Sequence, residues 1–479
     1  MSYMKNWLKG AFVLLFTVSF LTSASAQEYR FFEWEKNVGA HSVPTGQTVY
    51  NVNDYGAVGD DIQLNTEAIQ KAIDACAAAG GGIVTFGTGI YRTGSIYLKS
   101  NVKFEIPKGT ILKGSQDIAD YPRIDTRVAG VEIMWPSALI NAIDQENVAL
   151  TGDGTIDGMG KPFWDMYWDM RRNEYEPKGL RWIVDYDAER PRGILVQNCK
   201  NVTLSDFVMY RTGFWAIQIL YSQYVTLDGI VIDNNVDGHG PSTDGIDIDS
   251  SCDILVQNCD ISCNDDNFCL KAGRDFDGLR VNRPTERVVL RNNIARKGAG
   301  LVTCGSETSG GIRDIVGYDL TAIGTSGGAR FKSAFTRGGT VERIYLTDLN
   351  LVGVGTPIVV ELNWNPSYSY SELPAGYNYD EVPHHWKVML EQVDEVRGLP
   401  TIKDVYISNV HAVESRTGIS ASASEKSTID NFHLTNVYIE AERPGTISYA
   451  KNWTIENVKI VAKNGQAITV TNSPGVELK

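Results

Sequence analysis

The sequence predicts an all-β solenoid, because short strands repeat along the chain and no helices alternate with them. β-branched strands, each ended by a polar turn, recur from the middle of the chain to its end, and the first four are 23, 29 and 34 residues apart. An irregular period of about 20 to 35 residues is typical of coils that bury one face on the next coil. A doubly wound α/β fold is disfavoured, since it requires a helix between successive strands. The strands begin at Val202, Val225, Ile254, Val288, Ile344, Val405 and Trp453.

One helix is expected near the start of the solenoid. Residues 65–76 carry apolar side chains at helical spacing, begin with an Asn or Thr cap and are followed by three glycines at 80–82. A helix in this place would cover the open end of the core, which otherwise exposes apolar side chains and strand edges. We therefore expect a solenoid from about Tyr50 to the C-terminus, with this helix as its cap.

The first 26 residues have the composition of an export signal. The apolar run that follows Lys5 and Lys9 is too short to span a bilayer, and it ends in an Ala-Ser-Ala cleavage site. We expect a signal peptide over residues 1–26, a single catalytic domain over residues 27–479, and a periplasmic or secreted protein.

The overall charge excludes several kinds of partner. The 479 residues include 44 Lys and Arg against 58 Asp and Glu, for a net charge of −14. Such an acidic surface disfavours nucleic acids and anionic lipids. No stretch after the signal peptide is long and apolar enough for a membrane helix. We expect a soluble monomer with no nucleic-acid or membrane partner.

The seven cysteines indicate core packing rather than a metal site. Five of them lie between Cys252 and Cys304, without the paired C-x-x-C spacing that zinc sites use. Buried thiols behave as small hydrophobic side chains, which suits stacked coils. One disulfide among them remains an alternative.

An insertion is expected at residues 366–398. The step from Ile344 to Val405 is 61 residues, about thirty more than one coil needs. Insertions in solenoids gather on one face and often form the wall of a binding groove. The aromatic rings of the 366–398 insertion could stack on sugars, or this segment could pack down as a structural loop. The aromatic and imidazole side chains are those of Tyr368, Tyr370, Tyr377, Tyr379, His384, His385 and Trp386.

Three carboxylates form the candidate catalytic group. Asp244 and Asp266 are 22 residues apart and each lies two residues before a strand, so they should stack on adjacent coils about 4.8 Å apart. Asp265 stands beside Asp266. Carboxylates this close raise at least one pKa, as a general acid requires, and a glycosidase uses one acid and one base. The alternative is that Asp is simply frequent in solenoid turns.

The following coils extend this face. Ala299, within Gly298–Gly300, is expected in the same column as Asp244 and Asp266. Arg330 and Lys332 are two apart in a strand and share one side. These cations could bind an anionic substrate or only neutralise the aspartates. None of the six histidines has a Ser or metal partner, so we expect no serine triad, metal or cofactor.

At these residues the sequence resembles the polygalacturonase family, glycoside hydrolase family 28. The resemblance runs from about Tyr50 to Ile460 and implies a single-stranded right-handed parallel β-helix. Its most specific marks are a Thr-Asp-Gly motif, an Asp-Asp doublet and an Arg-x-Lys motif. Other marks are Tyr55–Asp60, Ala68–Cys76 with Gly80–Gly82, Gly152–Gly158, Arg190–Arg192 and Phe214–Trp215.

The resemblance also implies roles for these residues. Asp265 would be the general acid, and Asp244 and Asp266 would activate water in an inverting hydrolysis of α-linked galacturonate. Arg330 and Lys332 would hold the carboxylate of the sugar on the leaving side. The sequence departs from the family at Ala299, where a Gly-His-Gly motif usually carries a histidine. Further substrate-binding candidates are Lys271, His239 and Trp386.

We therefore expect a pectin-degrading glycosidase that acts from chain ends. The alternatives are a rhamnogalacturonan hydrolase of the same family, a β-helix pectate lyase and a non-catalytic polysaccharide-binding protein. The exo expectation rests on the 366–398 insertion and on the space left by Ala299. For an inverting enzyme, the acid and base carboxyls should be about 6.5–9.5 Å apart to admit a water.

Overall fold

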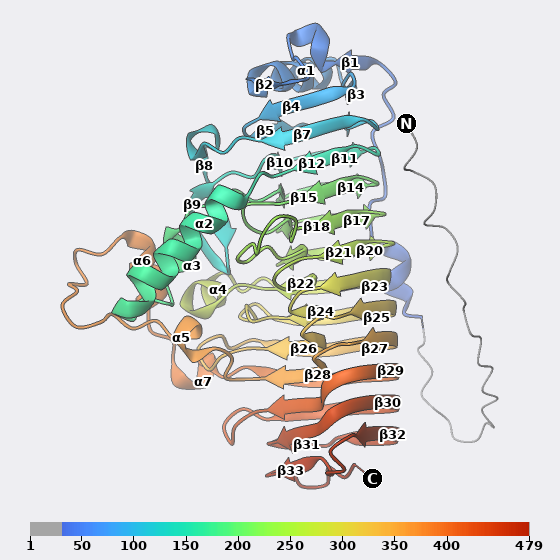
Figure 1. The fold of residues 1–479 in the computed structure, drawn as a ribbon, viewed down its shortest axis with the longest axis vertical. Helices are drawn as coiled ribbons and strands as arrows, with labels where there is room; N and C mark the ends of the chain where they lie inside the picture. Colours follow the sequence, from blue (N-terminus) through green and yellow to red (C-terminus); the bar gives the residue numbers. More distant parts are fainter. Residues whose placement is uncertain (1–30, 479) are drawn as a thin grey trace.

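A computed structural model describes residues 31–478 and shows a parallel β-helix (Figure 1). One sheet system contains 31 strands, all paired in parallel, and a separate two-stranded antiparallel hairpin lies outside it. The predicted β-helix is therefore confirmed. The predicted signal peptide lies outside the described residues. Within residues 31–478, no helix is both long and apolar enough to cross a membrane.

Each full coil contributes strands to three stacked series. The first series, which borders the candidate site, is β5 (Ile96–Leu98), β10 (Ile140–Ile143), β13 (Ile194–Gln197), β16 (Ile217–Leu220), β19 (Ile246–Asp249), β22 (Phe268–Lys271), β24 (Gly300–Cys304), β26 (Gly327–Lys332) and β28 (Thr356–Glu361).

The second series carries the predicted repeats. It consists of β1 (Val49–Asn51), β3 (Gly82–Thr85), β6 (Val102–Glu105), β11 (Glu146–Thr151), β14 (Lys200–Ser205), β17 (Gln223–Asp228), β20 (Cys252–Gln257), β23 (Thr285–Lys297), β25 (Ile312–Ile323), β27 (Thr340–Val352), β29 (Thr401–Ser422), β30 (Ile429–Ser448) and β32 (Thr454–Ala462). The predicted register is confirmed, because Val202 pairs with Val225, Val225 with Ile254, and Ile254 with Val288. These side chains are buried in one continuous apolar core.

The third series completes the coils. It contains β2 (Asp60–Leu64), β4 (Gly89–Thr93), β7 (Thr110–Gly114), β12 (Thr155–Asp157), β15 (Val208–Tyr210), β18 (Val231–Asp233) and β21 (Asp260–Ser262), after which β23 spans two faces by itself. Two short strands, β31 (Ala450–Lys451) and β33 (Thr469–Thr471), pair with β30 at the C-terminal end.

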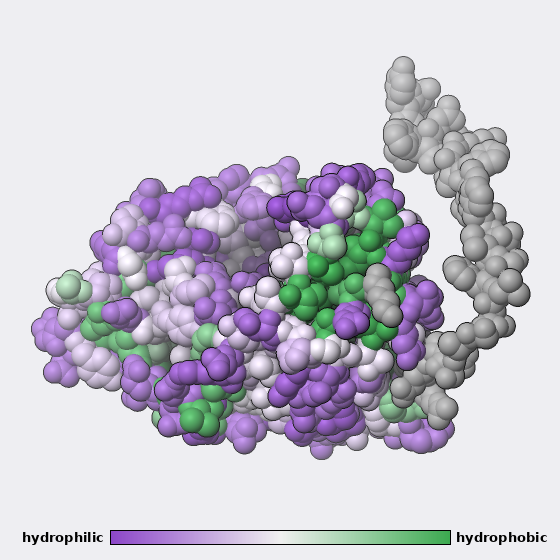
Figure 2. Space-filling view, turned by 90° about the horizontal axis from the view of Figure 1, so that it is seen from below, coloured by the Kyte–Doolittle hydropathy of each residue, from purple (hydrophilic) through white to green (hydrophobic). Residues whose placement is uncertain are grey.

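A helix covers the N-terminal end of the core, as predicted. Helix α1 (Thr66–Ala78) follows the cap residue Asn65 and buries one apolar face against the first coils. The C-terminal end has no such helix among the described residues. Figure 2, seen from that end, shows a hydrophobic patch on the last coils, and Val458, Ile460 and Val470 are only partly buried there.

Several elements outside the coils gather on one side of the β-helix and form a wall, at the left of Figure 1. Figure 2 shows a hollow between this wall and the β-helix. The wall consists of the hairpin β8 (Arg123–Val128) and β9 (Val131–Pro136), helices α2 (Lys161–Asp169), α3 (Val184–Asp187) and α4 (Asp275–Val281), and the insertion after β28.

The insertion packs down on the other wall elements. It contains the short helices α5 (Pro366–Ser369), α6 (His384–Leu390) and α7 (Glu395–Gly398). Trp386 is buried in a second apolar cluster, packs edge-on against Trp182 and donates its indole N–H to Asp187 at 2.9 Å. Its assignment as a substrate-binding residue is therefore wrong, because its ring and its N–H group are both used in packing the wall.

All seven cysteines are free thiols, and six of them are buried. The prediction that they act as core side chains is confirmed. The alternative of a disulfide is not realised.

Candidate active site

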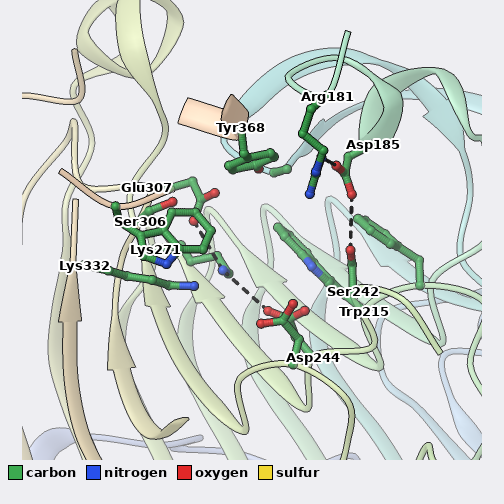
Figure 3. A pocket seen from close by; sticks show the side chains of 14 residues that line it. Arg181, Asp185, Trp215, Ser242, Asp244, Lys271, Ser306, Glu307, Lys332 and Tyr368 are labelled. Carbon is green, nitrogen blue, oxygen red and sulfur yellow. Dashed lines mark hydrogen bonds and ion pairs between the residues drawn. The ribbon is translucent and has the colours of Figure 1, made fainter. Parts of the chain in front are cut away.

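A pocket lies between the first strand series and the wall, and Figure 3 shows it from close by. Its empty volume is about 460 Å³, including the open mouth. Four parts of the chain contribute to it, namely the ends of the first-series strands, the turn of the β8–β9 hairpin, the α3 region and the segment that follows β28. The lining residues are Ala129, Arg181, Asp185, Phe214, Trp215, Ser242, Asp244, Asp265, Lys271, Ser306, Glu307, Lys332, Trp364 and Tyr368.

The three predicted aspartates meet at the floor of this pocket. Ile246 of β19 pairs with Phe268 of β22, so Asp244 and Asp266 occupy equivalent places on adjacent coils, as predicted. One oxygen from each of Asp244, Asp265 and Asp266 lies within 4.8 Å of the other two. Asp266 is fully buried, whereas Asp244 and Asp265 line the pocket.

This spacing is consistent with the 4.8 Å expected for stacked coils. It describes the nearest oxygens, whereas the about 6.5–9.5 Å usual in inverting glycosidases separates whole carboxyl groups. The stereochemical outcome stays a prediction that product analysis must decide.

The position of Ala299 also differs from the expectation. Phe268 pairs with Val302 of β24, so Gly300, two residues earlier, is level with Asp266. Ala299 instead donates its backbone N–H to the carbonyl oxygen of Asp265 at 2.7 Å. The predicted column was wrong by one residue, because Phe268 pairs with Val302 and not with Leu301, where the strand was expected to begin.

The three carboxyls differ in their pKa values. Burial and the neighbouring Asp265 raise the pKa of Asp244 well above its usual value, and burial and Asp266 raise that of Asp265. Burial also opposes ionisation of Asp266, but Lys332 and Arg330 outweigh it and lower its pKa. The predicted rise of at least one pKa is thus present, and the pocket holds both an ionised and a readily protonated carboxyl.

Arg330 and Lys332 both contact Asp266. Arg330 Nη1 lies 2.8 Å from Asp266 Oδ1, and Lys332 Nζ lies 2.7 Å from Asp266 Oδ2. This arrangement matches the alternative that the two cations neutralise the aspartates. Lys332 also lines the pocket, where its ammonium lies 4.3 Å from the centre of the Trp364 ring. Substrate binding by these two side chains stays a prediction.

Lys271 connects a second set of buried acids. Its Nζ lies 3.6 Å from Asp244, 3.5 Å from Asp247 and 3.3 Å from Glu307. Burial disfavours the charged form of Glu307, but Lys271 prevails and lowers the pKa of Glu307 to about 2. The Lys271 ammonium also faces the Trp215 ring at 5.0 Å. Lys271 therefore provides positive charge beside Asp244.

Several lining residues were not identified from the sequence. Arg181 and Asp185, which form an ion pair at 2.5 Å, come from a helical segment that shows no repeat pattern. Trp215 could have been found, because it lies two residues before Ile217 of β16, which pairs with Ile246. Trp215 therefore stands one coil before Asp244 in the same column.

His239 lies outside the group of residues that line the pocket. Its imidazole is exposed and stacks on Trp168 with ring centres 6.2 Å apart. A role of His239 in substrate binding is not supported by a contact with the three aspartates, and it stays a prediction.

Among residues 31–478, two groups of acidic or thiol donors are close enough to hold a metal ion. They are Asp244 with Asp247 and Cys269, and Asp244 with Asp265 and Asp266. Lys271, Arg330 and Lys332 already supply positive charge to these carboxylates. The acid–base chemistry considered below uses these side chains and needs no step through a metal.

Known proteins resemble this chain over most of its length. The family described as Glycosyl hydrolases family 28 matches residues 97–382. A probable polygalacturonase of Vitis vinifera is 30% identical over 62% of this chain and 60% of its own length. An exo-poly-alpha-D-galacturonosidase of Dickeya chrysanthemi is 26% identical over 88% of this chain and 75% of its own length.

A solved structure is also similar to this chain. The hyperthermoactive exopolygalacturonase of Thermotoga maritima superimposes with a TM-score of 0.76 at 25% identity, covering 90% of this chain and 95% of the other. The family match, which spans more than half of the chain, lies over the β-helix coils that carry the three aspartates. The chain therefore belongs to glycosyl hydrolase family 28 and is a glycosidase.

Proposed function

We propose that the protein hydrolyses α-linked galacturonate residues from the ends of pectic chains. The observation that carries this proposal is a pocket in which a protonatable carboxyl, Asp265, lies beside an ionised one, Asp266, with cations close by. Lys271 and Lys332 give the pocket positive charge that can attract a uronate carboxylate. Relatives named as polygalacturonases and an exo-poly-alpha-D-galacturonosidase support the same substrate class.

Asp265 is the general acid in this proposal. Among residues 31–478 it makes no ion pair within 4.0 Å, whereas Lys271 lies 3.6 Å from Asp244 and two cations contact Asp266. Burial and Asp266 raise the pKa of Asp265, so Asp265 can carry a proton beside the ionised Asp266. Asp265 then donates this proton to the glycosidic oxygen as the bond breaks.

Asp244 and Asp266 act on the attacking water. Asp244 lines the pocket and accepts the proton of the water, with Lys271 supporting its negative charge. Asp266 lies buried beside Asp244, and its carboxylate, kept ionised by Arg330 and Lys332, helps to hold the same water.

The wall supports action from chain ends. The insertion after β28 contributes Trp364 and Tyr368 to the pocket, and the segment before α3 contributes Arg181 opposite them. A groove closed on one side in this manner admits a chain end more readily than the middle of a chain. The names of the Dickeya and Thermotoga proteins agree with exo action.

Export completes the proposal. The sequence of residues 1–26 supports a periplasmic or secreted location, where a pectic polysaccharide or oligosaccharide would be the partner.

The variant Asp265→Asn tests the acid role. We expect kcat to fall about 10²-fold or more with an unchanged melting temperature, since general acids contribute on that order. The matched control is Asp260→Asn, which changes an exposed ion pair with Arg296 on another face of the coil. Wild-type activity in Asp265→Asn would remove this residue from the mechanism.

Product analysis tests the reaction itself. With oligogalacturonates, NMR of the fresh product should show inversion of the anomeric centre, and short products should appear before any mid-sized oligomers. A retained anomer would contradict the roles of Asp244 and Asp266. Early mid-sized oligomers with a rapid fall in viscosity would contradict exo action.

A further inference from the structure

A larger cavity lies next to the catalytic pocket, between the α3 region and the insertion. Its empty volume is about 940 Å³ including its mouth, compared with about 460 Å³ for the catalytic pocket. The hydrolytic steps proposed above make no use of it. We call it the outer cavity, and its lining residues are Glu176, Gly179, Arg181, Trp182, Pro366, Ser367, Tyr370 and Glu372.

The outer cavity and the catalytic pocket share a wall. Arg181 lines both, and its guanidinium lies 5.0 Å from the centre of the Tyr368 ring. Tyr368 faces the catalytic pocket, whereas Pro366 and Ser367, which precede it in α5, face the outer cavity. Figure 3 shows Arg181 and Tyr368 together at the upper edge of the pocket. The two cavities therefore adjoin at this pair of side chains.

The charges of the two cavities differ. The catalytic pocket has Lys271 and Lys332, whereas Arg181 is the one cation lining the outer cavity. The Arg181 guanidinium is already paired with Asp185 at 2.5 Å. A uronate carboxylate in the outer cavity would therefore find no unpaired cation.

One carboxylate adds uncompensated negative charge there. Glu372 makes no ion pair with any residue between 31 and 478, whereas Glu176 pairs with Arg171 at 2.7 Å. Like charges placed together disfavour binding, so Glu372 selects against a second uronate. A neutral sugar does not meet this repulsion.

The remaining lining residues suit a neutral sugar. Pro366 and the half-buried Tyr370 present apolar faces to the C–H groups of a ring, and aromatic contacts of this kind favour binding. The exposed hydroxyl of Ser367 and the carboxylate of Glu372 can hydrogen-bond to sugar hydroxyls.

We infer that the outer cavity is a subsite for a neutral sugar residue joined to the galacturonate in the catalytic pocket. This inference rests on the proposed function and names its substrate more narrowly. The substrate is a pectic chain end in which a galacturonate has a neutral neighbour or branch.

The variant Ser367→Trp tests this subsite by filling the outer cavity from an exposed position. The matched control is Gln392→Trp, an exposed position of the same insertion that does not line the cavity. The substrates are trigalacturonate and an oligosaccharide of equal length in which one residue is a neutral sugar. We expect Ser367→Trp to lower kcat/KM about tenfold or more on the second substrate, while trigalacturonate changes less than about twofold.

A second variant tests the charge selection. Glu372→Lys adds a cation to the outer cavity, so it should raise kcat/KM on trigalacturonate relative to the oligosaccharide with a neutral sugar. Equal ratios in wild type and Glu372→Lys would show that charge does not select the ligand.

The outcomes separate the two proposals. If the wild type hydrolyses both substrates and Ser367→Trp behaves as Gln392→Trp does on each, the subsite is wrong and the proposed function stands. If the wild type hydrolyses neither substrate, the proposed function fails, and the inference that rests on it fails too.

Discussion

Replacing Lys271 by Met should disturb both the stability and the pH profile of the enzyme. The ammonium of Lys271 is about 4% exposed and lies 3.3–3.6 Å from Asp244, Asp247 and Glu307. At an effective dielectric constant of about 20, the contact with the ionised Glu307 corresponds to about 5 kcal/mol of attraction. Much of this is offset by the cost of burying the ammonium, and removing one partner of a buried pair typically costs about 3–5 kcal/mol.

The loss of folding stability in Lys271→Met should depend on pH in a defined direction. Without the ammonium, the pKa values of the remaining carboxyls rise in the folded state. A raised pKa in the folded state favours folding while the group is protonated, and this contribution is lost as the pH rises. The destabilisation by Lys271→Met should therefore grow from acidic to neutral pH. The acidic limb of kcat/KM should also move to higher pH, because Asp244 must be ionised to accept a proton.

Urea unfolding and pH–rate profiles measure both effects. The control is Lys103→Met, which removes an ammonium 2.9 Å from Glu105 at a site about one third exposed. A pair of this kind contributes about 0–1 kcal/mol. If Lys271→Met loses no more stability than Lys103→Met and keeps the wild-type acidic limb, the assignment of Lys271 as the support of Asp244 is wrong.

Two other predictions concern individual charges near the site. Burial raises the pKa of Asp247 to about 8, so its protonated form adds stability at low pH that is lost as the pH rises through 8. Asp247→Asn should therefore lose less stability than the wild type as the pH rises from about 5 to about 9. Urea midpoints that fall by the same amount in both proteins over this range would contradict the prediction. The second prediction compares Arg330→Met with Lys332→Met. Lys332 lines the pocket, so its loss should raise KM for galacturonate substrates far more than for a neutral aryl glycoside. Arg330 contacts Asp266 outside the lining, so its loss should impair both substrates alike; the reverse pattern would exchange their roles.

The coils were predictable because every one of them repeats the same physical requirement. Each strand of the second series must bury β-branched side chains on its neighbours, and this places Val202, Val225, Ile254 and Val288 at matching positions. The helix that covers the end of the core was predictable from the cap residue Asn65 and from the glycines that follow the helix.

The wall could not be predicted in the same manner. Its apolar cluster joins segments near residues 128–135, 180–186, 214–215 and 382–389, which no local period relates. Trp386 illustrates the difficulty, because an aromatic residue in a long insertion can stack on a ligand or fill a core. The sequence pattern is the same for a ring that stacks on a ligand and for one that fills a core. Only the contacts of Trp386 with Trp182 and Asp187 show that it fills a core.

The ionisation pattern of the aspartates follows from how the coils stack. Asp265 and Asp266 are adjacent in the chain, and burial opposes the charge of both, yet their pKa values move in opposite directions. The difference comes from β26, where Arg330 pairs with Thr303 of β24 and so reaches Asp266 from two coils away.

Because side chains alternate along a strand, a slip of β26 by one residue would turn Arg330 and Lys332 away from Asp266 and into the apolar core. The register that buries Ala329 and Phe331 in the core is therefore the same register that directs both cations to Asp266. Core packing thus fixes Asp266 as the carboxyl of the three that stays ionised.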